Sequence, residues 1–266
     1  MRGGGFSMSG AVVMLAGPFR STAIIYNFLK SRFPISRVIL EPVPSRLEML
    51  RNRARKLGAV KVLGQFCFRS LIVPYLRAVS GPHLREIDRQ YQLDAAPIPE
   101  NEITSVASVN SMQSVGLLRK LEPRAIVVHG TRILSPDVLR AAPGRFINLH
   151  AGITPAYRGV HGAYWALAER QPQLCGVTVH VVDDGIDTGA ILAQAVISPS
   201  AQDNFATYER LQLAAGLPLL EQVLRARLNG SGDALPAPVI AEGVSRLWTH
   251  PTLTQYLRNR WRQEVK

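Results

Sequence analysis

Short runs of branched apolar residues alternate with stretches of helical periodicity along this chain, and this alternation restricts the fold more than any other feature. Residues 11–17 (AVVMLAG) predict a buried strand that ends in Gly-Pro, and the following RSTAIIYNFLKSRF has apolar residues at helical spacing. Residues 37–40 and 125–129 predict two further strands, and the helix-like SMQSVGLLRKLEP precedes the second of them. The order predicts an α/β fold with a mostly parallel sheet flanked by helices.

The second half of the chain continues this pattern and then changes character. It predicts strands at 146–149, 176–182 and 190–197 and helices at 160–169 and about 205–228. A connector rich in Gly and Pro, NGSGDALPAP, then leads to a short basic tail that ends in LTQYLRNRWRQEVK. We therefore expect a flexible tail over 1–10, the main domain over 11–200, and a short C-terminal extension over 201–266.

The charge of the chain favours anionic partners. Its 31 basic and 19 acidic residues give a net charge of +12, which attracts polyanions or anionic substrates. Cys67 and Cys175 stand too far apart in sequence for a zinc cluster and do not form the framework of a disulfide-stapled secreted domain. The first apolar run is too short for a signal peptide or a membrane span. A cytoplasmic protein is expected.

Residues 46–96 form a basic, mostly helix-like insert. Its apolar stretch VLGQFCFRSLIVPYLRAV is interrupted by Arg69 and Pro74, so we expect it not to span a bilayer. The preferred interpretation is a helix buried against the sheet. The alternatives are a helix in peripheral contact with a membrane surface and the face of a homodimer. No secondary structure is predicted for 80–100.

Polar side chains cluster at the end of one predicted strand. Strand alternation puts Asn148 and His150 on one face at the end of an apolar strand, where open α/β sheets bind ligands. The strand GVTVHVV runs into the loop DDGIDTG, whose Asp187 can face His150. An amide donor beside an imidazole oriented by a carboxylate suits proton transfer at a carbonyl carbon.

These residues carry a specific family resemblance. Asn-x-His at 148–150 is followed by Thr-Pro-x-Tyr-Arg-Gly at 154–159, by Gly-Val-Thr-x-His at 176–180 and by Asp187. The pattern resembles the folate-dependent formyltransferases, which include glycinamide ribonucleotide, methionyl-tRNA and sugar N-formyltransferases. The resemblance is strong over 124–197 and weaker over 11–40, and it implies a Rossmann-like fold.

The resemblance implies a chemistry for these positions. Asn148, His150 and Asp187 fall on the catalytic positions of the family. An acceptor amine would attack the formyl carbon of 10-formyltetrahydrofolate; Asn148 and a protonated His150 would stabilise the oxyanion, and Asp187 would favour the charged imidazole. No metal is required. Two segments would hold the folate: Gly130, Thr131, Arg132, Ile133 and Leu134 on one side, and Asp183, Asp184, Gly185 and Ile186 on the other.

The residues after His150 bear on the acceptor. Where the family often has His-Pro-Ser, this chain has His150-Ala-Gly152, a small-for-small change that leaves the catalytic groups intact and bears on the acceptor pocket.

Four further residues are candidates for contact with the acceptor: Arg20, Ser21, Tyr157 and Arg158. The arginines would bind an acceptor phosphate, and the turn that opens the first helix would hold an anion unless Ser21 or Thr22 simply caps that helix. His161 and His180 are interpreted as structural histidines, and Trp165 as core packing.

The acceptor itself stays open. About 36 residues follow Gly230, which we take as too few for the extra domain of the tRNA enzymes, so no nucleic-acid partner is favoured. The preferred acceptor is a phosphorylated small-molecule amine such as a nucleotide-linked amino sugar. The alternatives are a purine-pathway or amino-acid N-formyltransferase, a formyltetrahydrofolate hydrolase, and a catalytically silent module that binds RNA or a membrane.

Overall fold

The computed structural model describes residues 12–229 and 245–266. The flexible tail expected over 1–10 and nearly all of the Gly- and Pro-rich connector lie outside the described residues.

A seven-stranded sheet forms the centre of the molecule, in the order β3-β2-β1-β4-β5-β7-β8. The strands from β3 to β5 pair in parallel, whereas β7 runs antiparallel to both β5 and β8. The expectation of a mostly parallel, Rossmann-like sheet is confirmed. The strands are β1 Val12–Ala16, β2 Ile35–Leu40, β3 Ile103–Ser105, β4 Ala125–His129, β5 Phe146–His150, β7 Gly176–Val181 and β8 Ile191–Val196.

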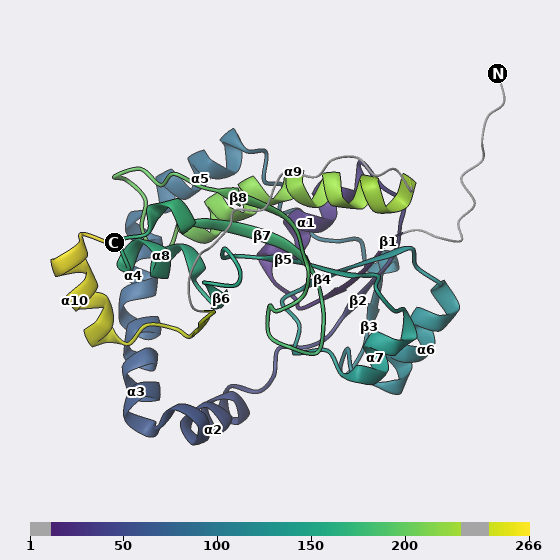
Figure 1. Cartoon of the computed structure of the whole chain (residues 1–266), viewed down its shortest axis with the longest axis horizontal. Helices are drawn as coiled ribbons and strands as arrows, with labels where there is room; N and C mark the ends of the chain where they lie inside the picture. The colour runs from purple at the N-terminus through teal and green to yellow at the C-terminus, as the bar shows by residue number, and fades with distance from the viewer. Residues whose placement is uncertain (1–11, 230–244) are drawn as a thin grey trace.

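Helices cover both faces of this sheet (Figure 1). Alternation along β1 sends Val12 and Met14 into a core with α1 and α9, and Val13 and Leu15 into a separate core with α6 and α7. The helices of these layers are α1 Arg20–Lys30, α6 Met112–Leu121, α7 Pro136–Ala141 and α9 Tyr208–Asn229. Helix α9 packs on β7 and β8, so a helix from beyond residue 200 covers the sheet of the main domain. The domain boundary expected at residue 200 stays a prediction.

The basic insert forms a chain of helices at the edge of the molecule (Figure 1). They are α2 Arg46–Leu57, α3 Ala59–Cys67, the π-helical turn η1 Phe68–Ile72, α4 Val73–Val79 and α5 Gly81–Gln90. Neither Arg69 nor Pro74 breaks the helix, because the wider π turn comes directly before the proline and Pro74 takes a position at the start of α4.

The preferred interpretation of this insert, a helix buried against the sheet, is wrong. Ala59–Val79 has 21 residues and a mean hydropathy of 1.2, so by length and composition alone it could cross a bilayer, and only 22% of its most apolar window is buried. Its inner side packs elsewhere, through Phe68 and Leu76, into a cluster with α8 Gly162–Ala168 and α10 Leu253–Gln263.

The C-terminal residues return to the middle of the chain. Strand β9 Leu247–Trp248 pairs in parallel with β6 Arg158–Gly159, and the indole of Trp248 stacks on Tyr157 and on Trp165. Thr252 and Gln255 form a capping box that starts α10. The extension therefore closes over the segment that follows β5. Two single-turn 3-10 helices, η2 Glu100–Glu102 and η3 Pro172–Leu174, complete the secondary structure.

Candidate active site

The three residues expected to be catalytic lie together. Antiparallel pairing of β5 and β7 places Asn148 opposite His180, and the loop after β7 brings Asp187 back to both strands. The Nδ1 atom of His150 lies 3.4 Å from Oδ2 of Asp187, and Nδ2 of Asn148 lies 3.4 Å from Oδ1. The backbone N–H of Gly159 donates to Oδ2 of Asp187 at 2.9 Å and fixes the carboxylate from a third side.

The hydrogen bonds of His150 determine which nitrogen can exchange a proton. Its Nε2 lies 2.8 Å from the carbonyl oxygen of Tyr157, which can only accept, so Nε2 must carry a hydrogen. Nδ1 is then the nitrogen that titrates. It faces Asp187 at a distance too long for a strong hydrogen bond in this state.

Burial and charge act in opposite directions on the two groups. Burial lowers the pKa of His150 below its usual value, although the Asp187 carboxylate and the bond to Tyr157 raise it. Burial alone would raise the pKa of Asp187, but His180, His150 and the Gly159 N–H outweigh it and lower that pKa. Both directions favour an ionised Asp187 beside a neutral His150 in the free site. The protonated His150 expected at the oxyanion stage of the reaction stays a prediction.

His180 belongs to this group of side chains, although its sequence context suggested only a structural role. Its Nδ1 donates to the carbonyl of Val181, so Nε2 is free to accept from Nδ2 of Asn148 at 3.2 Å, and Nε2 lies 3.6 Å from Asp187. The available signal was strand pairing: His180 and Asn148 both end up on the same face of neighbouring strands.

Gly152 allows His150 its position. A Cβ on residue 152 would lie 2.3 Å from the carbonyl oxygen of Tyr157 and 2.8 Å from Nε2 of His150, the two atoms of the orienting hydrogen bond. The glycine at position 152 therefore leaves room for this hydrogen bond.

The segment Gly130–Leu134 follows β4 at the same edge of the sheet. The backbone N–H of Arg132 donates to the buried carboxylate of Glu41 at 2.7 Å, and the Arg132 side chain also pairs with it. Asn110 holds the carbonyl of Ile133, whose side chain is exposed, while Leu134 is buried. Gly130 has a φ of 65°, and the ring of Phe19 lies against it. Thr131 is half-buried.

The loop 183–187 is held by its own first residue. Asp183 accepts from the backbone of Gly185 and from Thr188, while Asp184 is exposed and Ile186 is partly so. Asp187 itself adopts a left-handed φ of 53°, which turns its carboxylate back toward β5.

The four residues expected to contact the acceptor are differently placed. Arg20 is paired with Asp88 at 2.9 Å. The hydroxyl of Ser21 forms a hydrogen bond with Nε2 of His129, and burial lowers the pKa of His129 to about 4. Neither Ser21 nor Thr22 makes a side-chain cap at the start of α1, so the interpretation of these residues as a helix cap is wrong.

The other two follow β5 in sequence. The hydroxyl of Tyr157 donates to Gln171, so what this residue gives the site is its carbonyl. Arg158 donates to the carbonyl of Ile186, and its buried Nε has no partner among the described residues.

A second group, of two histidines and two arginines, stands beside this site. His161, the first residue before α8, bonds through Nε2 to Nδ1 of His250 at 2.7 Å. Burial, followed by the charges of Arg69 and Arg53, lowers the pKa of His161 to about 3. Burial, followed by His161 and the same two arginines, lowers the pKa of His250 to about 2. Neither Arg53 nor Arg69 forms an ion pair with any acidic residue whose side chain the structure describes. The sequence did not single out this group, because it joins residues of α2, η1, α8 and the C-terminal extension.

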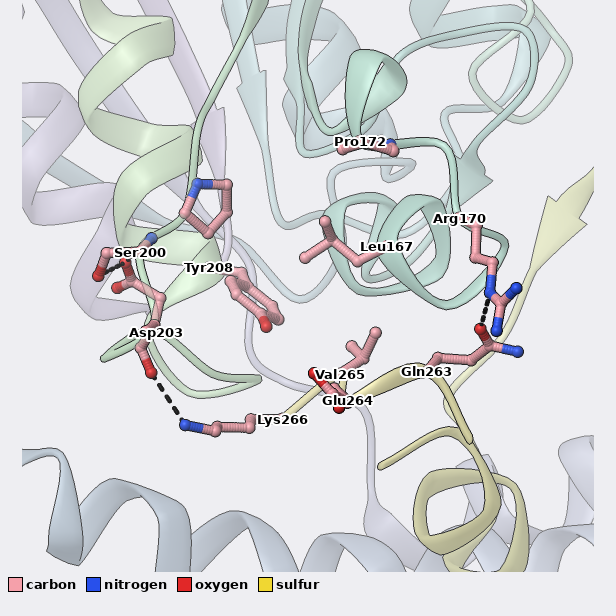
Figure 2. A pocket seen from close by; sticks show the side chains of 12 residues that line it. Leu167, Arg170, Pro172, Ser200, Asp203, Tyr208, Gln263, Glu264, Val265 and Lys266 are labelled. Carbon is pink, nitrogen blue, oxygen red and sulfur yellow. Dashed lines mark hydrogen bonds between the residues drawn. The ribbon is translucent and has the colours of Figure 1, made fainter. Parts of the chain in front are cut away.

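A cavity of about 590 Å³ lies elsewhere on the molecule, and Figure 2 shows the side chains that line it. The C-terminal residues line it together with Leu167 and Tyr208, and Lys266 donates to the carbonyl of Ala201 at 2.9 Å. None of the residues around Asp187 contributes to its wall.

Comparison with known proteins assigns the family. A model of the formyl transferase family matches residues 87–224, which is more than half of the chain. The chain belongs to the formyl transferase family. The matched range contains Asn148, His150 and Asp187 and the segment Gly130–Leu134.

Curated relatives are methionyl-tRNA formyltransferases. That of Anaeromyxobacter dehalogenans strain 2CP-1 is 37% identical over 205 residues, which cover 73% of this chain and 64% of the relative. That of Pelotomaculum thermopropionicum is 31% identical over 144 residues, covering 53% of this chain and 45% of the relative. The chain thus spans less than two thirds of the length of these relatives.

Solved structures share the fold. A phosphoribosylglycinamide formyltransferase from Streptococcus pneumoniae aligns with a TM-score of 0.52 at 19% identity, covering 81% of this chain and 98% of that one. A sugar N-formyltransferase from Shewanella sp. aligns with a TM-score of 0.53 at 16% identity, covering 89% of this chain and 75% of that one.

Proposed function

We propose that this protein transfers a formyl group from 10-formyltetrahydrofolate to the amine of a small anionic acceptor. The observation that carries the proposal is the convergence of Asn148, His150 and the ionised Asp187 at the end of β5. Family membership adds support for formyl transfer. The names of the relatives, which span tRNA, purine and sugar enzymes, do not select one acceptor.

The geometry supports separate roles for Asn148 and His150 in the reaction. As the acceptor amine attacks the formyl carbon, the carbon–oxygen double bond opens and negative charge develops on oxygen. The Nδ2 group of Asn148 is held only by long contacts to His180 and Asp187, so one N–H can turn to that oxygen. A donor in such a position contributes about 3–4 kcal/mol to stabilising the transition state.

His150 would accept the proton that the amine loses. Its Nδ1 is unprotonated in the free site and faces Asp187, which stabilises the positive charge that the ring gains. The proton then passes to the leaving nitrogen of the folate. The carbon–oxygen double bond re-forms as the carbon–nitrogen bond to the donor breaks, which releases tetrahydrofolate and the formylated amine. No bond to the protein forms at any step.

The folate would lie between Gly130–Leu134 and the loop 183–186. Exposed apolar side chains on both segments, Ile133 and Ile186, offer faces for a flat ring. These features fit a ligand with an aromatic body.

The acceptor would be anionic because of the arginines beside the site. Arg53 and Arg69 act electrostatically on His161, which lies two residues from Gly159, the donor to Asp187. Burial and the neighbouring Arg69 lower the pKa of Arg53, so a phosphate there would relieve an unfavourable pair of charges. A nucleotide-linked amino sugar has both the phosphate and the amine. A cytoplasmic location stays a prediction.

An acceptor-library assay tests the proposal. The purified full chain is incubated with 10-formyltetrahydrofolate and with amino sugars, nucleotide-linked amino sugars, glycinamide ribonucleotide, amino acids or methionyl-tRNA, and formylated products are identified by mass spectrometry. Formylation of a phosphorylated amine in preference to its unphosphorylated form supports the proposal. Release of formate without an amine product indicates a hydrolase, and exclusive formylation of methionyl-tRNA contradicts the small acceptor.

A further inference from the structure

An exposed apolar face runs along the helix formed by α3, η1 and α4. Val60 is 87% exposed, and Leu63, Leu71 and Tyr75 are each 62% exposed. They recur at three- and four-residue intervals or multiples of these, which puts them on one side of the helix. We call this side the outer face; Phe66 and Val79 extend it. Soluble proteins rarely leave so long an apolar strip in water unless something covers it.

The charge around the outer face has one sign. Between Glu48 and Glu86 the sequence has eight lysine or arginine residues and no acidic residue. Lys61 and Arg77 stand exposed on the same helix. The neighbouring α10, which packs against α3 and η1, carries three arginines, no acid and the indole of Trp261, which is 81% exposed.

We propose that the outer face docks the protein onto the surface of a membrane that contains anionic lipids. Apolar side chains on one side of a helix, flanking cations and exposed aromatic rings are the features of helices that lie in the bilayer interface. Juxtamembrane cations add about 1 kcal/mol each, or roughly five-fold in partitioning, toward an anionic leaflet.

The inner side of the helix fixes its orientation. Phe68 is completely buried against Phe205 and Tyr256, with ring centroids 4.8 Å and 5.0 Å apart. Gln65 donates to the carbonyl of His250 at 2.7 Å. A helix that crossed the bilayer would lose these contacts, so the helix lies along the membrane surface although its length would allow a span.

Charge also argues against a second copy of this chain as the occupant. A two-fold contact through the outer face would set each cation of one copy near the cations of the other, with no acid on the helix to separate them. An anionic lipid surface matches both the apolar side chains and the charge.

Vesicle co-sedimentation of the full chain, without folate or acceptor, tests this independently of any enzymatic activity. We expect the protein to sediment with vesicles of phosphatidylcholine and phosphatidylglycerol, to remain largely free with phosphatidylcholine alone, and to be released by salt. Leu63→Glu combined with Leu71→Glu should abolish sedimentation. Lys61→Glu combined with Arg77→Glu should reduce partitioning by roughly five-fold or more per cation.

Matched controls come from α6, on a different part of the molecule. Met112→Glu changes another exposed apolar side chain, and Arg119→Glu with Lys120→Glu makes the same change in net charge; both should bind like the wild type. All the substituted side chains are exposed, so unchanged melting temperatures are expected throughout.

Three results would overturn the proposal. The first is failure of the wild type to bind vesicles with phosphatidylglycerol, and the second is an equal loss of binding in the α6 controls. The third is a dimer of the wild type in solution, seen by sedimentation velocity, that becomes a monomer in Leu63→Glu with Leu71→Glu, together with no binding of the wild type to vesicles. That result would assign the outer face to a second copy.

Discussion

The imidazole of His150 is held between two oxygen atoms: Nε2 donates to a backbone carbonyl, and Nδ1 faces the carboxylate of Asp187 at 3.4 Å. This arrangement leaves a single nitrogen free to exchange a proton and sets a fixed negative charge beside it. Asn148 completes the site with an amide directed at the same carboxylate.

Replacement of His150 by Ala should lower turnover by roughly 10²–10⁴, because the proton acceptor is lost. Asn148→Ala should lower it by about 10²–10³ through loss of the oxyanion donor. Single-turnover formyl transfer measures both, and circular dichroism checks folding. His83→Ala, which removes a histidine paired with Asp203 instead of Asp187, serves as the control. Normal turnover in His150→Ala would remove this residue from the mechanism.

Asp187→Asn should shift the pH dependence of turnover toward acid. Burial lowers the pKa of His150 and the Asp187 carboxylate raises it, so loss of the carboxylate lowers that pKa further. The acid limb, where neutral His150 gains a proton, therefore moves to lower pH, and the maximal rate falls by roughly 10²-fold as the charged ring loses its partner. Asp94→Asn, which changes an exposed carboxylate that accepts from the backbone N–H of Ala96, should change neither. An unmoved limb would mean that the two groups are not coupled.

Strand alternation put Asn148 and His150 on one face, and the loop after β7 allowed Asp187 to face His150, because strand ends and Gly-rich loops are places where local patterns specify position. The catalytic roles of these residues were implied by the family resemblance and stay a prediction. The basic insert could not be predicted in the same way. An apolar helix has the same composition whether it packs on a sheet or lies at the surface. The π-helical turn before Pro74, which keeps the helix continuous there, has no clear sequence pattern.

The joining of distant segments was also beyond local reasoning. Trp248 reaches Tyr157 and Trp165 across most of the second half of the chain, and β9 is only two residues long, too short for any periodicity to reveal. The contacts of His180 with Asn148 and Asp187 could not be predicted for a similar reason. Its partners become visible only when β5 and β7 are paired in register.

The buried histidine pair should make the fold sensitive to acid. The pKa of His161 is lowered from 6.5 to about 3, so the unfolded chain binds a proton at this residue at a pH where the folded protein does not. The stability that the buried neutral His161 contributes to the fold is fully present above pH 6.5 and is lost as the pH falls from 6.5 toward 3.

His161→Asn tests this effect while keeping a polar partner for His250. Over that pH range the slope of unfolding free energy against pH, from urea titrations, should flatten by up to about 1.4 kcal/mol per pH unit. An identical slope in the variant would show that His161 is already protonated in the folded protein.

The cations beside the site should distinguish the acceptor from the formyl donor. Arg53→Gln and Arg69→Gln each remove a guanidinium that has no acidic partner among the described residues, and Arg158→Gln removes one whose buried Nε is free. If these groups bind the acceptor phosphate, each change costs one charge-assisted hydrogen bond and should raise the acceptor KM by roughly 10- to 100-fold, with the KM for formyl-folate nearly unchanged. Arg20→Gln should have the smallest effect, because Asp88 already holds that side chain. Steady-state kinetics with each substrate varied in turn, using the best acceptor from the library assay, makes the comparison. A rise in the folate KM for Arg53→Gln or Arg69→Gln would assign these arginines to the formyl donor instead. A larger acceptor effect for Arg20→Gln than for either would move the phosphate site to the start of α1.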